Sequence, residues 1–125
     1  MNRVSLSGTE QEVMRFIWAQ PGITALELSE KLKAEGKDYE KNLYAYLTRC
    51  IKKGYVERQE PDYRCYPLIS PEESQAEALR KVLRKLFNNS PAALVETLVN
   101  ERPLTKEEAD KIRSLIDRFD EGLEK

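Results

Sequence analysis

Apolar residues recur at helical spacing through most of this chain. Within residues 38–54 the apolar positions fall three, four, seven or eight residues apart, and they are Leu43, Leu47, Cys50 and Ile51. That spacing places them on one face of a helix, and the other positions of the stretch are mostly polar or small. The pattern predicts an amphipathic helix over 38–54 that is capped by Asp38 and ends at a left-handed Gly54.

Two shorter helices precede this stretch, and both begin with the same capping pattern. In each, a hydroxyl residue is followed three positions later by glutamate, a pair that satisfies two backbone N–H groups at a helix start. The pairs are Ser7 with Glu10 and Thr24 with Glu27. The apolar positions of these helices predict a core that includes Val13, Met14, Ile17, Leu28 and Leu32.

After residue 54 the pattern changes to that of strands. Residues 55–58 and 63–68 are rich in β-branched and aromatic side chains, and residues 59–62 between them have the composition of a turn. We therefore predict a β-hairpin whose second strand ends at Pro67. Three helices followed by a hairpin form the plan of a winged helix-turn-helix domain, which we assign to residues 1–69.

The rest of the chain, residues 70–125, predicts three further helices that begin at Ser70, Ser90 and Thr105. These helices are too few to bury their apolar faces alone, so we expect a three-helix dimerisation domain, with packing back onto the first domain as the alternative. The expected fold class is mainly α with a small β-hairpin. The expected interface residues are Leu79, Leu83, Leu94, Leu98, Ile112, Leu115 and Phe119.

Charge is nearly balanced in this chain of 125 residues. The net charge is −1, and residues 1–70 hold eleven lysines and arginines against ten aspartates and glutamates. A nucleic-acid surface must therefore be a local patch, and a protein-binding module without DNA binding is the alternative function. No apolar run is long enough to span a membrane and no signal-peptide pattern is present, so we expect a cytoplasmic protein without membrane insertion.

Histidine is absent from the sequence. This removes histidine-dependent acid–base catalysis, Ser-His and Cys-His nucleophiles and histidine-containing zinc sites, so we expect no enzyme activity, cofactor or metal. Two cysteines, Cys50 and Cys65, are too few for a disulfide framework. We interpret Cys50 as core packing, and Cys65 either as packing or as a thiol sensor.

The outer face of the 38–54 helix carries the residues expected to contact DNA; a merely solvated surface is the other interpretation. Its donors and methyl groups suit base edges in the major groove. The expected reading residues are Lys41, Asn42, Tyr44, Ala45 and Thr48, with Asn42 foremost as a partner of adenine. The expected phosphate contacts are Lys52, Lys53, Arg58, Arg64, and Thr24 with the free amides of its helix. Glu40 would repel phosphate.

Several short motifs follow one another in a recognisable order. They are Leu6-Ser7 with Glu10, Ile17-Trp18, Thr24-Ala25 with Glu27, Leu47-Thr48-Arg49, Ile51-Lys52-Lys53-Gly54, and the run from Tyr66 to Glu73. In this order the chain resembles the BlaI/MecI/CopY-type penicillinase repressor family over nearly its full length. The resemblance implies a homodimer that represses transcription from a palindromic double-stranded DNA operator, in antibiotic-resistance regulation and with a membrane sensor-protease system as a further partner.

The chain also departs from that family at three places. Residues 39–42 read Tyr-Glu-Lys-Asn and differ from the family's usual start of the recognition helix, so base preference is expected to differ. The Asn-Phe pair that a sensor protease cleaves in some members is Thr97-Leu98 here, which argues against cleavage at that bond. No cysteine follows Cys65, which argues against the copper sensing of other members.

Overall fold

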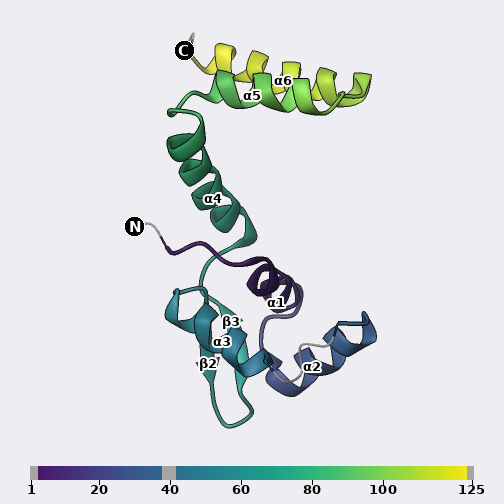
Figure 1. Cartoon of the computed structure of the whole chain (residues 1–125), viewed down its shortest axis with the longest axis vertical. Coiled ribbons are helices and arrows are strands. Elements are labelled where there is room, and N and C mark those ends of the chain that lie inside the picture. The colour runs from purple at the N-terminus through teal and green to yellow at the C-terminus, as the bar shows by residue number, and fades with distance from the viewer. Residues whose placement is uncertain (1–2, 38–41, 124–125) are drawn as a thin grey trace. The chain divides into compact units, whose positions relative to one another are not determined.

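The computed structural model describes residues 3–37 and 42–123. It divides into two compact units, Met1–Lys81 and Val82–Lys125. The elements, in chain order, are α1 (Gly8–Ala19), β1 (Ile23–Thr24), α2 (Ala25–Ala34), α3 (Leu43–Lys52), β2 (Val56–Gln59), β3 (Arg64–Pro67), α4 (Pro71–Leu86), α5 (Pro91–Glu101) and α6 (Lys106–Leu123) (Figure 1). The boundary between the units falls inside α4, and the division of functions at residue 69 stays a prediction.

The helices begin where the capping residues predict. In α1 the Ser7 hydroxyl accepts a hydrogen bond from the Glu10 amide, and the Glu10 carboxylate accepts one from the Ser7 amide. The same reciprocal pair opens α2. At α4 and α6 the hydroxyls of Ser70 and Thr105 each accept from the amide three residues on, at 3.1 Å. Four helix starts are therefore set by contacts within four residues of sequence.

Helix α3 is shorter than predicted. It begins at Leu43, and Asn42 before it has a non-helical backbone (φ −116°, ψ 3°); the predicted cap Asp38 lies outside the described residues. Leu43 is buried in the core, so burial stabilises the helix from its first turn. The predicted end is confirmed, because Gly54 has φ +86° and the amides of Gly54 and Tyr55 donate to the carbonyls of Ile51 and Cys50.

The sheet has one strand more than the predicted hairpin. Its order is β1-β3-β2, and both pairs are antiparallel. Strand β1 pairs Ile23 with Cys65 and Thr24 with Arg64, so the start of α2 is joined to the hairpin. Two residues are too short to show strand alternation in sequence. Three helices with this small sheet confirm the winged helix-turn-helix fold of the first domain.

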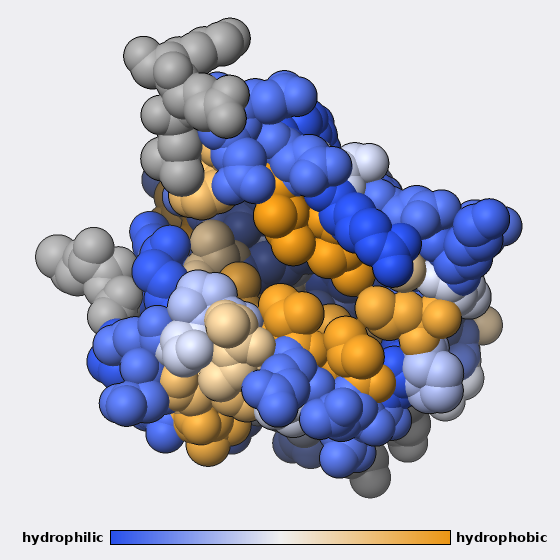
Figure 2. All heavy atoms as spheres, turned by 90° about the horizontal axis from the view of Figure 1, so that it is seen from above, coloured by the Kyte–Doolittle hydropathy of each residue, from blue (hydrophilic) through white to orange (hydrophobic). Residues whose placement is uncertain are grey.

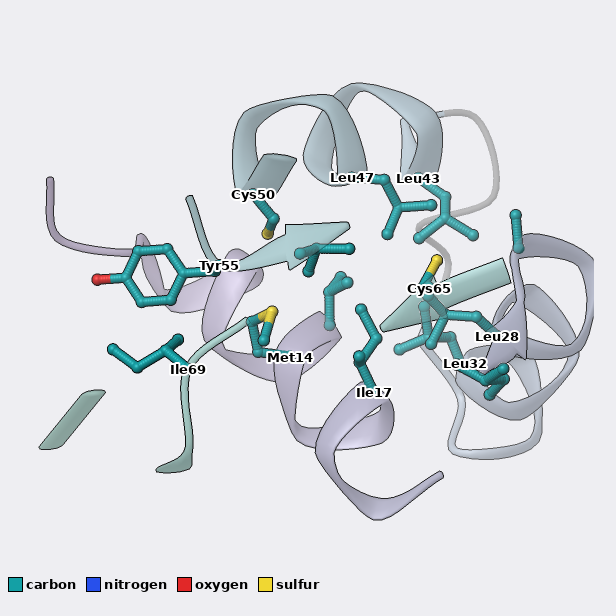
Figure 3. Packing of buried hydrophobic residues seen from close by; sticks show 14 residues of the cluster. Met14, Ile17, Leu28, Leu32, Leu43, Leu47, Cys50, Tyr55, Cys65 and Ile69 are labelled. Atoms are coloured by element: carbon teal, nitrogen blue, oxygen red, sulfur yellow. The ribbon is translucent and has the colours of Figure 1, made fainter. Parts of the chain in front are cut away.

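The core of the first unit lies between α1, α2, α3 and the sheet (Figure 3). Side chains from all of these elements point into one cluster, made of Val13, Met14, Ile17, Ile23, Ala25, Leu28, Leu32, Leu43, Leu47, Cys50, Tyr55, Val56, Cys65 and Ile69. Trp18 packs at the edge of this cluster, and its indole N–H donates to the Ile69 carbonyl at 2.8 Å. The predicted core positions are confirmed, and they hold one face of α3 against the domain.

Candidate nucleic-acid interface

The buried face of α3 leaves a row of polar side chains exposed on its other side. Because Leu43, Leu47 and Cys50 are buried, the residues between them face outward. Tyr44, Thr48 and Lys52 are exposed and lie four positions apart, so they form one ridge along the helix, with Ala45 beside it. The Thr48 hydroxyl donates to the Tyr44 carbonyl at 2.8 Å and retains acceptor capacity. We call Tyr44, Thr48 and Lys52 the α3 ridge.

Asn42 stands at the N-terminus of α3. Its side chain is exposed and makes no capping hydrogen bond. The carboxamide is therefore available to a ligand that approaches the start of the helix, as the sequence predicts for a base contact. The other predicted contact in this region, Lys41, lies outside the described residues, as does Glu40.

The start of α2 is less open than predicted. The Thr24 hydroxyl accepts from the Glu27 amide and donates to the Glu27 carboxylate at 2.9 Å. The Ala25 amide donates to the Tyr63 carbonyl at 3.0 Å. Hydrogen bonds from Thr24 hold the pKa of Glu27 below its usual range, so this end of the helix carries a negative charge. The Thr24 hydroxyl and the Ala25 amide are therefore already engaged, and the Glu27 charge disfavours the phosphate contact predicted at Thr24.

The hairpin carries two arginines, each with a protein partner and each about half exposed. On β2, the Arg58 guanidinium lies 3.8 Å from the centre of the Tyr63 ring and pairs with Glu60. On β3, Arg64 donates to the Gly22 carbonyl at 3.1 Å and lies 3.7 Å from Asp62. The exposure of both side chains is compatible with the phosphate contacts predicted for them.

A groove runs between α3 and the hairpin. Its floor and rim are formed by Thr48, Ile51, Lys52, Val56, Glu57, Arg58, Tyr63 and Leu68. The structure thus brings together Thr48, Lys52 and Arg58 from the predicted contacts. It also adds Tyr63, whose aromatic character gave only a strand signal in the sequence.

Lys53 does not belong to this surface, which corrects the prediction for that residue. Its ammonium lies 2.5 Å from the Glu10 carboxylate and donates to the Ser5 carbonyl at 2.9 Å. Glu10 is only 2% exposed. Burial raises the pKa of Glu10, but the bonds from Lys53 and Ser7 outweigh it and the pKa is lowered. Lys53 therefore neutralises a buried carboxylate of α1.

Both cysteines are buried in the core (Figure 3). Burial raises the pKa of Cys50 to about 12, with a further contribution from Glu10, and raises the pKa of Cys65 to about 11. Thiolates are the reactive form of cysteine, and buried apolar surroundings suppress them. The interpretation of both residues as packing is supported, and the thiol-sensor interpretation of Cys65 is not.

We expect neither thiol to react in the folded protein. In native buffer at a pH of about 8, Ellman's reagent should release almost no chromophore over an hour, because both sulfur atoms are inaccessible and protonated. In about 6 M guanidinium chloride the same sample should release two equivalents, one for each cysteine in the sequence. One equivalent released rapidly from the native protein would identify an exposed thiol and contradict the burial of Cys65.

Apolar side chains are exposed along the C-terminal helices. Leu79, Leu98, Leu115 and Phe119 are 46%, 46%, 49% and 65% exposed, and Leu83, Leu94 and Ile112 are partly buried. Orange, hydrophobic residues are correspondingly visible among blue, polar ones on the surface (Figure 2). These residues are those predicted to lie at a dimer interface, and the single chain leaves them without full cover.

Comparison with known proteins decides the family. The sequence model of the penicillinase repressor family matches residues 6–118. The chain belongs to this family. It is 22% identical over 115 residues to the methicillin resistance regulatory protein MecI of Mammaliicoccus sciuri, covering 90% of this chain and 94% of that protein. It is also 22% identical over 116 residues to the penicillinase repressor of Staphylococcus aureus, covering 91% and 92%.

Solved structures of MarR-type regulators are also similar. The MarR protein from Peptoclostridium difficile DA00132 is 22% identical, covers 94% of this chain and 71% of that chain, and has a TM-score of 0.42. MepR, a transcription regulator of the Staphylococcus aureus multidrug efflux pump MepA, is 15% identical, covers 94% and 80%, and has a TM-score of 0.43. Both TM-scores are low, and the winged-helix fold follows instead from the order of helices and strands.

Membership of the penicillinase repressor family fixes the broad function. The matched residues include the whole winged-helix fold with its exposed α3 ridge and most of the C-terminal helices. The protein is a DNA-binding transcriptional repressor, and its relatives are regulators rather than enzymes. Among the described helices, none is both long and apolar enough to cross a membrane.

Proposed function

We propose that the protein acts as a homodimer that represses transcription by binding a palindromic operator. The α3 ridge is the observation that carries this proposal. Tyr44, Thr48 and Lys52 are exposed on the second helix of the α2–α3 pair, beside a hairpin that carries Arg58. A helix in that position enters the major groove with its N-terminal residues toward the bases.

The contacts divide into reading and positioning. Asn42 reads a base at the start of α3, and Tyr44 and Ala45 meet the thymine methyl groups beside it, with Thr48 one turn further on. Lys52, Arg58 and Arg64 neutralise phosphates on either side of the groove. Lys41 belongs to the reading set by its place in the sequence.

Two copies joined through the C-terminal helices would present two α3 ridges related by a two-fold axis. Such a dimer matches a palindromic site, because each half-site meets the same surface. The interface residues we propose are Leu79, Leu83, Leu94, Leu98, Ile112, Leu115 and Phe119. The relatives' roles in methicillin resistance and penicillinase repression favour antibiotic-resistance genes as targets. We expect such a repressor to act in the cytoplasm, where bacterial DNA lies.

Induction by a membrane sensor-protease is a further expectation from the family. The pair Thr97-Leu98 lies inside α5, where the cleaved members carry Asn-Phe. We therefore expect any such protease to leave this bond intact. Incubation with a protease that cuts the family pair, followed by mass spectrometry of the fragments, tests this directly.

The proposal is tested by titrating the full-length protein against DNA from upstream of its own gene. Fluorescence anisotropy should show specific binding whose logarithmic affinity falls linearly with the logarithm of salt concentration. With three cations from each protomer on phosphates, the affinity should fall by roughly 10³-fold between 50 and 200 mM salt. Absence of binding to any upstream fragment, together with a stable protein complex, would favour the protein-binding module instead.

Asn42→Ala should weaken operator binding about tenfold, the usual value of one good base contact. Because the Asn42 side chain makes no capping bond, the variant should unfold at the same temperature as wild type. Non-specific binding to a scrambled duplex should not change. Asn100→Ala removes an exposed carboxamide from α5 and serves as the matched control. Equal operator affinity for both variants would exclude Asn42 from base reading.

A further inference from the structure

Tyr63 contacts all three elements that form the proposed DNA surface. It lies at the end of the turn between β2 and β3, with a left-handed backbone (φ +52°) that non-glycine residues rarely adopt. Its carbonyl accepts a hydrogen bond from the Ala25 amide at the start of α2, at 3.0 Å. The backbone of this one residue therefore fixes the turn of the hairpin to the first turn of α2.

The side chain of Tyr63 joins the other two elements. The ring packs against the core and is met on one side by the Arg58 guanidinium, 3.8 Å from its centre. The Tyr44 ring meets it edge-on, with centres 5.4 Å apart and planes at 68°. Tyr63 also lines the groove together with Thr48 and Arg58. Tyr44 of the α3 ridge and the arginine of β2 thus share one aromatic ring.

We propose that Tyr63 is a positioning residue for DNA binding, which sets the distance between Arg58 and the α3 ridge. This inference rests on the proposed function. A free arginine loses side-chain conformational entropy when a phosphate fixes it. A guanidinium already held over a ring loses less, and its plane is preset. Glu60 pairs with Arg58 as well, but a carboxylate competes with phosphate, whereas the ring leaves the guanidinium edge free to donate.

The role predicts energetic coupling between Tyr63 and Arg58 in DNA binding. If Tyr63 only supported the fold, replacing it would lower stability and leave the contribution of Arg58 to affinity unchanged. If it positions Arg58, either replacement removes the same contact, and the two losses are not additive. The number of phosphates neutralised, measured from the salt dependence, should then fall in both variants.

The closing experiment measures operator affinity and its salt dependence for full-length variants. Tyr63→Phe keeps the ring and should bind within about twofold of wild type. Tyr63→Leu and Arg58→Ala should each bind about three- to tenfold more weakly, the range of a cation–π contact. The double variant should be no weaker than either single variant. The slope of logarithmic affinity against logarithmic salt concentration should decrease by about one per protomer in Tyr63→Leu, in Arg58→Ala and in the double variant.

Two further variants protect the test from a folding defect. Arg58→Lys keeps the charge on an exposed side chain but loses planar stacking. On its own it should therefore bind the operator about threefold more weakly than wild type. Added to Tyr63→Leu, it should not change the affinity of that variant. Tyr66→Leu alters the partly buried tyrosine of β3, whose ring packs against Gly22. It should leave the salt slope unchanged, and melting temperatures report the stability of every variant.

Additive losses for Tyr63→Leu and Arg58→Ala would overturn the positioning role. So would wild-type affinity for Tyr63→Leu, or an effect of Tyr63→Phe as large as that of Tyr63→Leu. If the wild-type protein binds its upstream DNA and shows no coupling, only this inference fails. If the wild-type protein binds no DNA, the proposed function fails and the inference fails with it.

Discussion

Phe119→Asp should yield a monomer that binds the operator at least about 100-fold more weakly than wild type. Phe119 is 65% exposed in the single chain, so aspartate there does not disturb the monomer itself. In a dimer interface the same change buries an unpaired charge against apolar neighbours, which costs several kcal/mol. Separated protomers also lose the effective concentration that makes the second half-site easy to bind, a factor of about 10² to 10⁴.

Sedimentation velocity gives the oligomeric state, and anisotropy gives the affinity for the full palindrome and for an isolated half-site. The full-site affinity should fall while the half-site affinity stays within about twofold of wild type, since the loss comes from linkage of two sites. Ser114→Asp adds the same charge to an exposed position of α6. Ser114 precedes Leu115 in sequence but points about 100° away from it around the helix, so this variant should remain a dimer. A dimeric Phe119→Asp protein, with Leu115→Asp also dimeric, would exclude α6 from the interface.

Lys53→Met should lower the free energy of unfolding by about 3 kcal/mol at neutral pH. The ammonium of Lys53 lies 2.5 Å from a Glu10 carboxylate that is almost fully buried. Methionine keeps most of the apolar stem but leaves that carboxylate without its cation, and uncompensated buried charges are strongly destabilising. Urea unfolding followed by circular dichroism measures the change. Lys52→Met, at the exposed neighbouring position, should stay within about 0.5 kcal/mol of wild type.

The pH dependence follows from the direction of the Glu10 shift. Its pKa in the folded protein lies below the ordinary value of 4.5, because the bonds from Lys53 and Ser7 outweigh burial. The stabilisation is therefore complete above pH 4.5 and is lost as the pH falls through the lowered pKa.

The difference in stability between wild type and Lys53→Met should shrink on acidification, because the variant regains stability when Glu10 is protonated. Adding Glu10→Gln to Lys53→Met should recover much of the loss at neutral pH. A difference that is constant with pH would mean that Glu10 is not the partner.

Much of the fold could be predicted from the sequence because its signals are local. Ser7, Thr24, Ser70 and Thr105 each cap a helix through an amide three residues away. Gly54 ends α3 because only a residue tolerant of positive φ closes that turn. The apolar period of each helix indicated which face the core would bury. The order of these elements, together with short motifs, was enough to indicate the family.

The candidate site was predicted only in part, for a reason that is also physical. Tyr44, Thr48, Lys52 and Arg58 are placed as their helical or strand positions indicate, whereas Asn42 is exposed but precedes the helix. Strand β1 and Tyr63 were missed, because a two-residue strand has no period and the contacts of Tyr63 come from α2, α3 and β2. The availability of the Thr24 hydroxyl and of the free amides at the start of α2 was overestimated. The Thr24 hydroxyl is hydrogen-bonded to Glu27, and the Ala25 amide donates to the Tyr63 carbonyl.

The adjacent lysines at the end of α3 show where the boundary lies. The sequence by itself determined that an amphipathic helix would end with Lys52, Lys53 and Gly54, and that its other face would carry polar groups. It treated the two lysines alike, because local pattern assigns both the same charge and exposure. Only the tertiary structure separated them. Lys52 continues the exposed ridge, whereas Lys53 meets Glu10, 43 residues away in sequence. Which of the two cations remains exposed depends on which buried charge another element brings within reach, and that is decided by packing between helices.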